Sequence, residues 1–232
     1  MEEIVISITK KEVETKLIAS MLEILPNEDF ILRKKDKKIL HKTKPGFEAF
    51  GFDILNYWPY CTEVSGVGFS IRFNAVEEIT VPIEVKNDIR ASMEFAKTST
   101  TMHDWHEFNI KIFNEEDLNN FIHVNINKTK EDGLSFFAKY SDMLNANVYY
   151  KNRVLNDDKN DVHIEWDWHP ISKSLTLMKL CGDKDFDEMK IKYRQMMEIR
   201  YRQIEDLMHE KHWQEEKIFA AYDDLVQYLS NL

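Results

Sequence analysis

The stretch from Val67 to Ala75 constrains the fold of this chain more than any other. It spells Val-Gly-Phe-Ser-Ile-Arg-Phe-Asn-Ala, so an apolar side chain stands at every second position. Successive side chains of an extended backbone point to opposite sides, which makes one face of such a strand apolar and the other polar. A helix, with about 3.6 residues per turn, would scatter the same apolar residues around its circumference. The stretch therefore predicts a half-buried strand whose aromatic face must be covered by other elements.

Alternating stretches on either side of this strand predict an antiparallel sheet. Residues 30–41 contain two short apolar runs around the charged sequence Arg-Lys-Lys-Asp-Lys-Lys, which indicates a hairpin, and residues 50–54 alternate again. Consecutive hairpins form an antiparallel meander, here from about residue 30 to residue 76. Stretches near 108 and near 165 repeat the alternation and predict later strands.

Helical periodicity in the other segments completes the expected fold. Thr9 and Glu12 have the spacing of a capping box, which begins a helix, and Asn114 is a suitable cap for another. Residues 80–97 predict a helix with Thr80 as its N-cap and Pro82 in its first turn. Further helices are expected at 114–122, 136–144 and 174–180. We therefore expect an α+β fold in which helices cover the aromatic face of the sheet.

The C-terminal segment is expected to be helical throughout. Residues 183–232 contain neither Gly nor Pro, and their apolar residues recur at intervals of three to five. This pattern fits one long helix or two helices that fold back near residues 210–212. We expect an α+β domain at 1–182 and a helical segment at 183–232 that packs on it or forms an arm. A single domain overall is the alternative.

Charge and composition limit the partners. The net charge of −10 disfavours nucleic acid and anionic membranes, which are themselves negative. The two cysteines do not form a disulfide framework, and the chain begins without the pattern of a signal peptide. No apolar run approaches the length of a membrane span, which is about 18 residues or more. We expect a soluble cytoplasmic protein.

The densest group of potential metal ligands lies at 162–169, Val-His-Ile-Glu-Trp-Asp-Trp-His. In a strand, its imidazoles and carboxylates would share one face, and these are ligands that Zn, Mn and Fe recruit. Residues two apart on a strand are about 7 Å apart, so other ligands must come from residues 103–107. Candidate ligands are His103, His106, His163, Asp167 and His169, and candidate general bases are Glu107 and Glu165. The alternative interpretation is the ordinary polar outer face of a sheet.

The charged hairpin is a candidate docking site. Residues 33–44 contain seven basic residues and one acid. Candidate partner-binding residues are Arg33, Lys34, Lys35, Lys37 and Lys38. Lysines at a sheet edge also prevent aggregation, which is the alternative. No aromatic residues interleave with the lysines, so nucleic-acid binding is not expected.

No nucleotide-binding loop or hydrolase elbow occurs in the sequence. We therefore expect a non-enzymatic protein-binding or regulatory module. Its contacts would use the sheet face, the basic hairpin or the C-terminal helices, including self-association through those helices. The alternative is a metal-dependent hydrolase or nuclease that uses the His/Asp/Glu group and a divalent metal.

Overall fold

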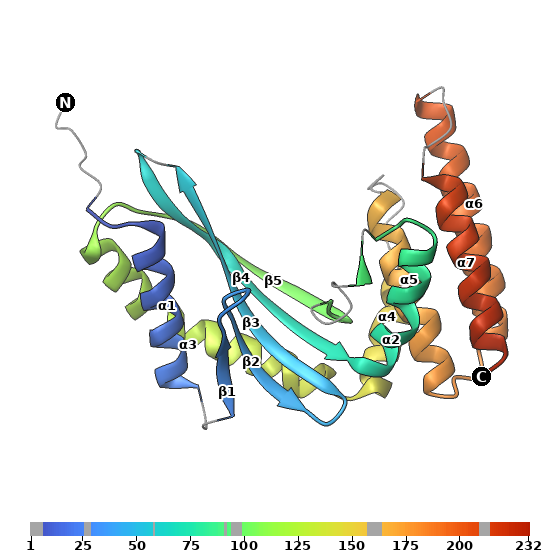
Figure 1. Ribbon diagram of the computed structural model, residues 1–232, viewed down its shortest axis with the longest axis horizontal. Coiled ribbons are helices and arrows are strands. Elements are labelled where there is room, and N and C mark those ends of the chain that lie inside the picture. The colour runs from blue at the N-terminus through green and yellow to red at the C-terminus, as the bar shows by residue number, and fades with distance from the viewer. Residues whose placement is uncertain are drawn as a thin grey trace. The chain divides into compact units, whose positions relative to one another are not determined.

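The computed structural model describes residues 7–25, 29–57, 59–90, 92–93, 99–156, 164–208 and 214–232, with the backbone alone at 164–167 and 207–208. The chain forms two compact units. The first consists of Met1–Arg72 and Met102–Ser141, and the second of Phe73–Thr101 and Asp142–Leu232. Each unit has its own buried apolar core. Figure 1 labels the helices and strands of both units.

The first unit contains a five-stranded antiparallel sheet with the strand order β1-β2-β3-β4-β5. The strands are β1 (Phe30–Arg33), β2 (Lys38–Thr43), β3 (Gly46–Tyr57), β4 (Cys61–Phe73) and β5 (Met102–Ile112). The order follows the sequence, so every connection joins neighbouring strands. This confirms the α+β class, the meander and the strand near residue 108.

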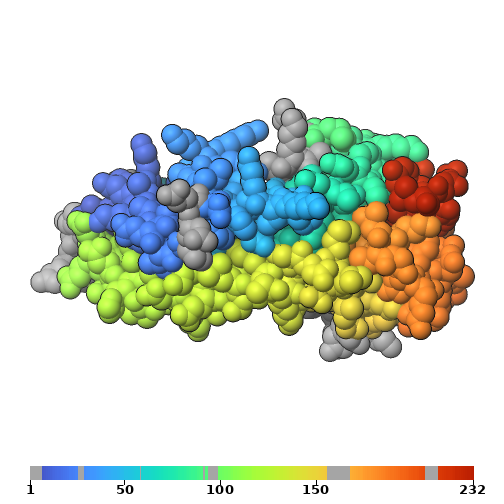
Figure 2. Space-filling view, turned by 90° about the horizontal axis from the view of Figure 1, so that it is seen from below, coloured from blue at the N-terminus to red at the C-terminus, as the bar shows by residue number. Residues whose placement is uncertain are grey.

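Two helices of the first unit, α1 (Lys10–Ile24) and α3 (Glu115–Tyr140), cover the aromatic face of the sheet. The ring of Phe69 lies 6.3 Å from that of Phe136, and Phe50 meets Phe137 edge to face at 5.1 Å. Figure 2 shows the yellow-green surface of α3 alongside the blue surface of α1 and the hairpin. The prediction that later helices cover the aromatic face of β4 is thus confirmed.

The other face of β4 is buried as well, which corrects the expected half-burial. Ser70 is buried on this face, and a Cβ atom on Gly68 would lie 2.8 Å from Cε1 of His103. Trp105 lies over Gly66 in the same way. The long side chains of β5 therefore cover the positions where β4 has no side chain of its own.

Two of the three predicted N-caps are confirmed. Thr9 and Glu12 form a reciprocal capping box at the start of α1, and the Asn114 side chain accepts from the Asp117 amide at the start of α3. Two helices were expected between 114 and 144, but α3 runs unbroken through Gly133. A Cβ atom at Gly133 would clash with the ring of Phe50 and lie 3.0 Å from Cδ1 of Phe69. Glycine here allows the helix to approach the sheet closely instead of ending it.

Helix α2 (Asn74–Lys86) begins the second unit and corrects another prediction. Instead of running over 80–97, it starts directly after β4 and ends at Lys86, so Pro82 lies inside it. Thr80 is not an N-cap, because its hydroxyl donates to the Val76 carbonyl one turn earlier. The apolar residues Val76, Val81 and Ile83 bury one side of the helix, and this packing outweighs the helix-breaking tendency of proline.

The prediction of a strand at 162–168 is wrong for the described residues of this stretch. Residues from Ile164 onward belong to α5 (Ile164–Leu180), and residues 161–163 lie outside the described part. Trp168, Ile171, Leu175 and Met178 are all buried, at helical intervals of three and four. Burial of this helical face overrides the short alternation that precedes it.

The remaining helices of the second unit are α4 (Met143–Asn156), α6 (Phe186–Met208) and α7 (Glu215–Ser230). The C-terminal segment thus contains two helices, and the bend expected at 210–212 lies outside the described residues. Both helices contact α5 within this unit. The boundary at residue 182 stays a prediction. Among the described residues, no helix has the length and apolar character needed to cross a membrane.

We expect Gly133→Ala to lower the free energy of unfolding by about 1–3 kcal/mol, because the new methyl group overpacks against Phe50. Helix propensity alone predicts the opposite sign, since Ala is better than Gly inside a helix by about 1 kcal/mol. Urea unfolding followed by circular dichroism measures the difference. Gly51→Ala is the control, because its nearest neighbour would be Lys38 Cγ at 3.5 Å. A Gly133→Ala variant as stable as the wild type would contradict the close contact.

Candidate functional site

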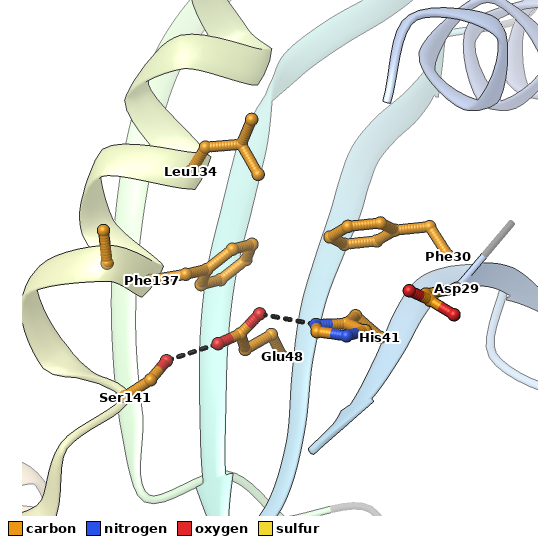
Figure 3. A pocket seen from close by; sticks show the side chains of 8 residues that line it. Asp29, Phe30, His41, Glu48, Leu134, Phe137 and Ser141 are labelled. Atoms are coloured by element: carbon orange, nitrogen blue, oxygen red, sulfur yellow. Dashed lines mark hydrogen bonds and ion pairs between the residues drawn. The ribbon is translucent and has the colours of Figure 1, made fainter. Parts of the chain in front are cut away.

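A cavity of about 350 Å³ opens between the hairpin strands and the C-terminal end of α3 in the first unit (Figure 3). Its lining combines ionisable, hydroxyl and apolar side chains. They are Asp29, Phe30, His41, Glu48, Leu134, Phe137, Ala138 and Ser141. All of them belong to the first unit, and they come from three strands, one helix and two loop positions.

Strand register places the polar floor of this cavity. His41 on β2 lies directly opposite Phe30 on β1 and Glu48 on β3, so the three form a row across the sheet. Residues directly opposite each other point to the same face, here the one that α3 covers. Ser141 follows the last residue of α3 and reaches Glu48 from above the sheet. The site therefore depends on where α3 ends.

Glu48 is the centre of the polar contacts. The residue is only 8% exposed, and its Oε2 atom lies 2.9 Å from Nδ1 of His41. The hydroxyl of Ser141 donates to the other carboxylate oxygen (Figure 3). A carboxylate that is largely removed from water requires such partners to remain ionised at low cost. The two contacts fix the position of the Glu48 carboxylate at the bottom of the cavity.

The order of the contacts differs from that of a catalytic Ser-His-acid triad. In a nucleophilic triad the histidine lies between the hydroxyl and the carboxylate, so that it can take the hydroxyl proton. Here Glu48 lies between Ser141 and His41. Ser141 donates a hydrogen bond to the carboxylate, so these three residues do not have the order of a triad, and their geometry orients Glu48.

The opposite wall of the cavity is apolar. The rings of Phe30 and Phe137 face the space above Glu48, and Leu134 lies beside them (Figure 3). Asp29 supplies a second, exposed carboxylate at the rim. Ring faces and carboxylates both attract positive charge, while the rings also accept an alkyl chain. The cavity thus has the chemistry to hold a cation on an apolar stem.

The predicted ligands His103 and His106 lie on opposite faces of β5. His103 is opposite Ser70 in register, with its Nδ1 atom 3.3 Å from the Ser70 hydroxyl. His106 instead faces α3, where its Nδ1 atom lies 3.0 Å from a carboxylate oxygen of Asp132. The two imidazoles therefore do not converge on one metal ion. Glu107, a candidate base, accepts a hydrogen bond from the Asn109 side chain.

The other predicted ligands belong to the second unit or lie outside the described part. His163 is outside it, and so are the side chains of Glu165 and Asp167. His169 lies on α5, with Nδ1 3.2 Å from Glu84. Within the described ranges, no three His, Cys, Asp or Glu side chains are grouped so that they could hold a metal. The metal hypothesis stays a prediction.

The structure places the basic hairpin residues in two groups. Arg33 pairs with Asp36 and lies over the ring of Phe47, and Lys37 pairs with Glu14 of α1. The alkyl chain of Lys38 runs beside Gly51, and burial lowers its pKa. Three of the five candidates are thus engaged within the unit. Lys34 and Lys35 are exposed in the turn.

A charged cluster inside the second unit was missed at the level of sequence. Glu77, Thr80 and Glu84 lie on one face of α2 and meet His169 and Lys173 of α5. The ammonium group of Lys173 is 2.8 Å from both Glu77 and Thr80, and Arg90 is 2.6 Å from Glu84. Both carboxylates are fully buried. In the sequence, Glu77, Thr80 and Glu84 stand at i, i+3 and i+7, which places them on one face of a helix, and this pattern could have indicated the cluster.

The environment of the two buried glutamates favours their charged forms. Burial would raise the pKa of Glu84, but the hydrogen bond with His169 and the positive charges of Lys173 and Arg90 lower it to about 2. Burial of Glu77 is likewise opposed by Lys173, and its pKa is lowered. Paired charges in this setting hold α2 and α5 in one register, because separation would leave a buried charge unpaired.

Comparison of the sequence with protein-family models, curated proteins and solved structures finds no match. The function must therefore be argued from the chain's own residues. The expected cytoplasmic location stays a prediction.

We expect the free energy of unfolding of the second unit to fall in acid, because Glu84 becomes protonated. A carboxyl group whose pKa is lower in the folded than in the unfolded state stabilises the fold above the unfolded pKa, and this is lost as the pH falls. Glu84 should therefore contribute about 3 kcal/mol to the free energy of unfolding at neutral pH, lost between about pH 5 and pH 2. Urea unfolding at several pH values measures this.

Glu84→Gln should be less stable than the wild type at neutral pH and should show a flatter dependence on acid. The control is Glu78→Gln, which removes an exposed carboxylate from the same helix. An acid dependence in Glu84→Gln equal to that of the wild type would show that Glu84 does not have the lowered pKa.

Proposed function

We propose that the protein is a non-enzymatic binding module whose first unit takes up a cationic side chain, Lys or Arg, of a partner protein. One observation supports this most directly. The carboxylates of Asp29 and Glu48 and the rings of Phe30 and Phe137 line one cavity of about 350 Å³. Carboxylates select positive charge, and the rings select the alkyl stem that carries it.

The surroundings of Glu48 suit a site that binds without catalysis. His41 and Ser141 hold both oxygens of the carboxylate from within the protein, which fixes its position before any ligand arrives. A preorganised group loses little side-chain freedom when it binds. The rings supply apolar area at low entropic cost, since each has only two rotatable side-chain bonds.

The charge of the whole chain supports a basic partner. With a net charge of −10, the protein attracts cationic surfaces and repels nucleic acid and anionic lipid. The metal-dependent hydrolase stays an alternative prediction. Its test is the metal content of the purified protein, together with the change in melting temperature when Zn, Mn or Fe is returned to chelator-treated protein.

A titration with side-chain models tests the binding proposal. We expect Nα-acetyl-lysine methylamide and the arginine analogue to shift the backbone amide NMR signals of Glu48 and Ser141, with a dissociation constant on the order of millimolar for so small a ligand. The norleucine analogue has the alkyl stem without the charge, so it should cause much smaller shifts. Equal shifts from the norleucine and lysine analogues would contradict selection by charge.

Single substitutions test whether Asp29 and Glu48 bind the lysine analogue. Asp29→Asn and Glu48→Gln should each weaken binding of the lysine analogue by about three-fold or more, since each removes a charge that faces the cation. Asp53→Asn is the matched control, because Asp53 is an exposed carboxylate on the same strand as Glu48. Asp29 is exposed, so its variant keeps the fold even if Glu48→Gln does not. Unchanged binding in Asp29→Asn would place the cation elsewhere.

A further inference from the structure

Helix α6 carries an exposed stripe in addition to its buried one. The buried side of the helix, which includes Met189, Tyr193 and Met197, packs inside the second unit. On the other side, Ile191 and Ile199 remain 58% and 57% exposed. They lie two turns apart with the exposed Gln195 midway between them, so all three line up along one side of the helix. Two isoleucines so exposed on one helix face suit helix pairing.

The stripe carries the same apolar residue on both sides of Gln195 and opposite charges at its two ends. Ile191 and Ile199 are each four residues from Gln195, and Glu188 and Arg202 are each seven residues from it. If a second copy of α6 is laid antiparallel with Gln195 opposite Gln195, each isoleucine meets the other isoleucine. Glu188 then meets Arg202 at both ends of the contact. The face is therefore complementary to itself, as a two-fold interface requires.

The two end charges also select the orientation of the pair, since charged residues beside an apolar seam set the orientation of paired helices. A parallel pair in register would place Glu188 opposite Glu188 and Arg202 opposite Arg202. The antiparallel pair places opposite charges together at both ends, so these residues favour the antiparallel orientation.

A groove beside the stripe enlarges this surface. It has a volume of about 450 Å³, lies between α6 and α7, and includes Ile191, Gln195, Tyr222 and Val226 in its lining. All of these residues belong to the second unit. The apolar surface of the stripe therefore continues toward α7, where a second helix gains further contact.

We propose that the protein forms a two-fold symmetric dimer in which this face of α6 binds the same face of a second copy. The inference is independent of the cation pocket, which lies in the first unit. One helix per chain gives a small interface, so the dimer is weak, with a dissociation constant on the order of micromolar or higher. It is an antiparallel pair of helices with two isoleucine contacts, a central pair of glutamines and two Glu188–Arg202 ion pairs.

Charge reversal in the full-length chain tests the dimer by sedimentation velocity over a range of concentrations. In Glu188→Arg, two Arg–Arg contacts replace the two ion pairs, and in Arg202→Glu two Glu–Glu contacts do so. Each single variant should dissociate about ten-fold more readily than the wild type, because attraction becomes repulsion at both ends at once. The double variant restores both pairs with the charges exchanged, and its affinity should return to near that of the wild type.

Mixing the two single variants gives the most specific readout. A heterodimer of Glu188→Arg with Arg202→Glu has opposite charges at both ends, whereas each homodimer has like charges. The mixture should therefore associate more strongly than either variant alone. Glu131→Arg, which reverses an exposed glutamate on α3 of the first unit, is the control and should leave association unchanged. A wild-type chain that is monomeric up to millimolar concentration, or a mixture no stronger than its components, would overturn the proposal.

Discussion

The close contact of α3 with the aromatic face of the sheet is the constraint on which the first unit depends. Phe50 and Phe69 fill this face, and Gly133 allows the helix backbone to reach them. The same contact positions α3 on the sheet, and Ser141, which follows the last residue of this helix, then lies above Glu48. The candidate binding cavity is thus a consequence of core packing, since its lining residues come from both layers, sheet and helix, that the aromatic residues hold together.

Each unit buries glutamate side chains, and in each unit these carboxylates have hydrogen-bonding or charged partners. In the first unit, Glu48 is held by an imidazole and a hydroxyl next to an open cavity. In the second unit, Glu77 and Glu84 are fully enclosed and matched by Lys173, His169 and Arg90. A buried charge that is paired inside the protein stabilises a particular packing, whereas a charge at a cavity is available to a ligand. This difference in access is why the first site is proposed to bind and the second is interpreted as structural.

Several features could be predicted from the sequence because neighbouring residues alone determine them. The capping box of Thr9 and Glu12 and the cap at Asn114 act over three residues, so their spacing was sufficient. The alternation in β4 gave the strand and its buried aromatic face, and the meander followed from consecutive hairpins. One failure occurred where two local signals competed, and others occurred where tertiary packing decided, as at Gly133 of α3. At 164–168 an alternating pattern met a helical one, and burial of Trp168, Ile171 and Leu175 decided for the helix.

The sequence by itself thus determined the α+β class, the order of the strands and the caps of two helices, all of which rest on local periodicity and spacing. Only the tertiary structure decided which polar residues meet. Glu48 and Ser141 are 93 residues apart in the chain, and Lys173 and Glu77 are 96 apart. No local pattern encodes such a pairing, because it depends on how helices and strands pack after they have formed. The same packing buried one side of α6 and left Ile191 and Ile199 exposed on the other.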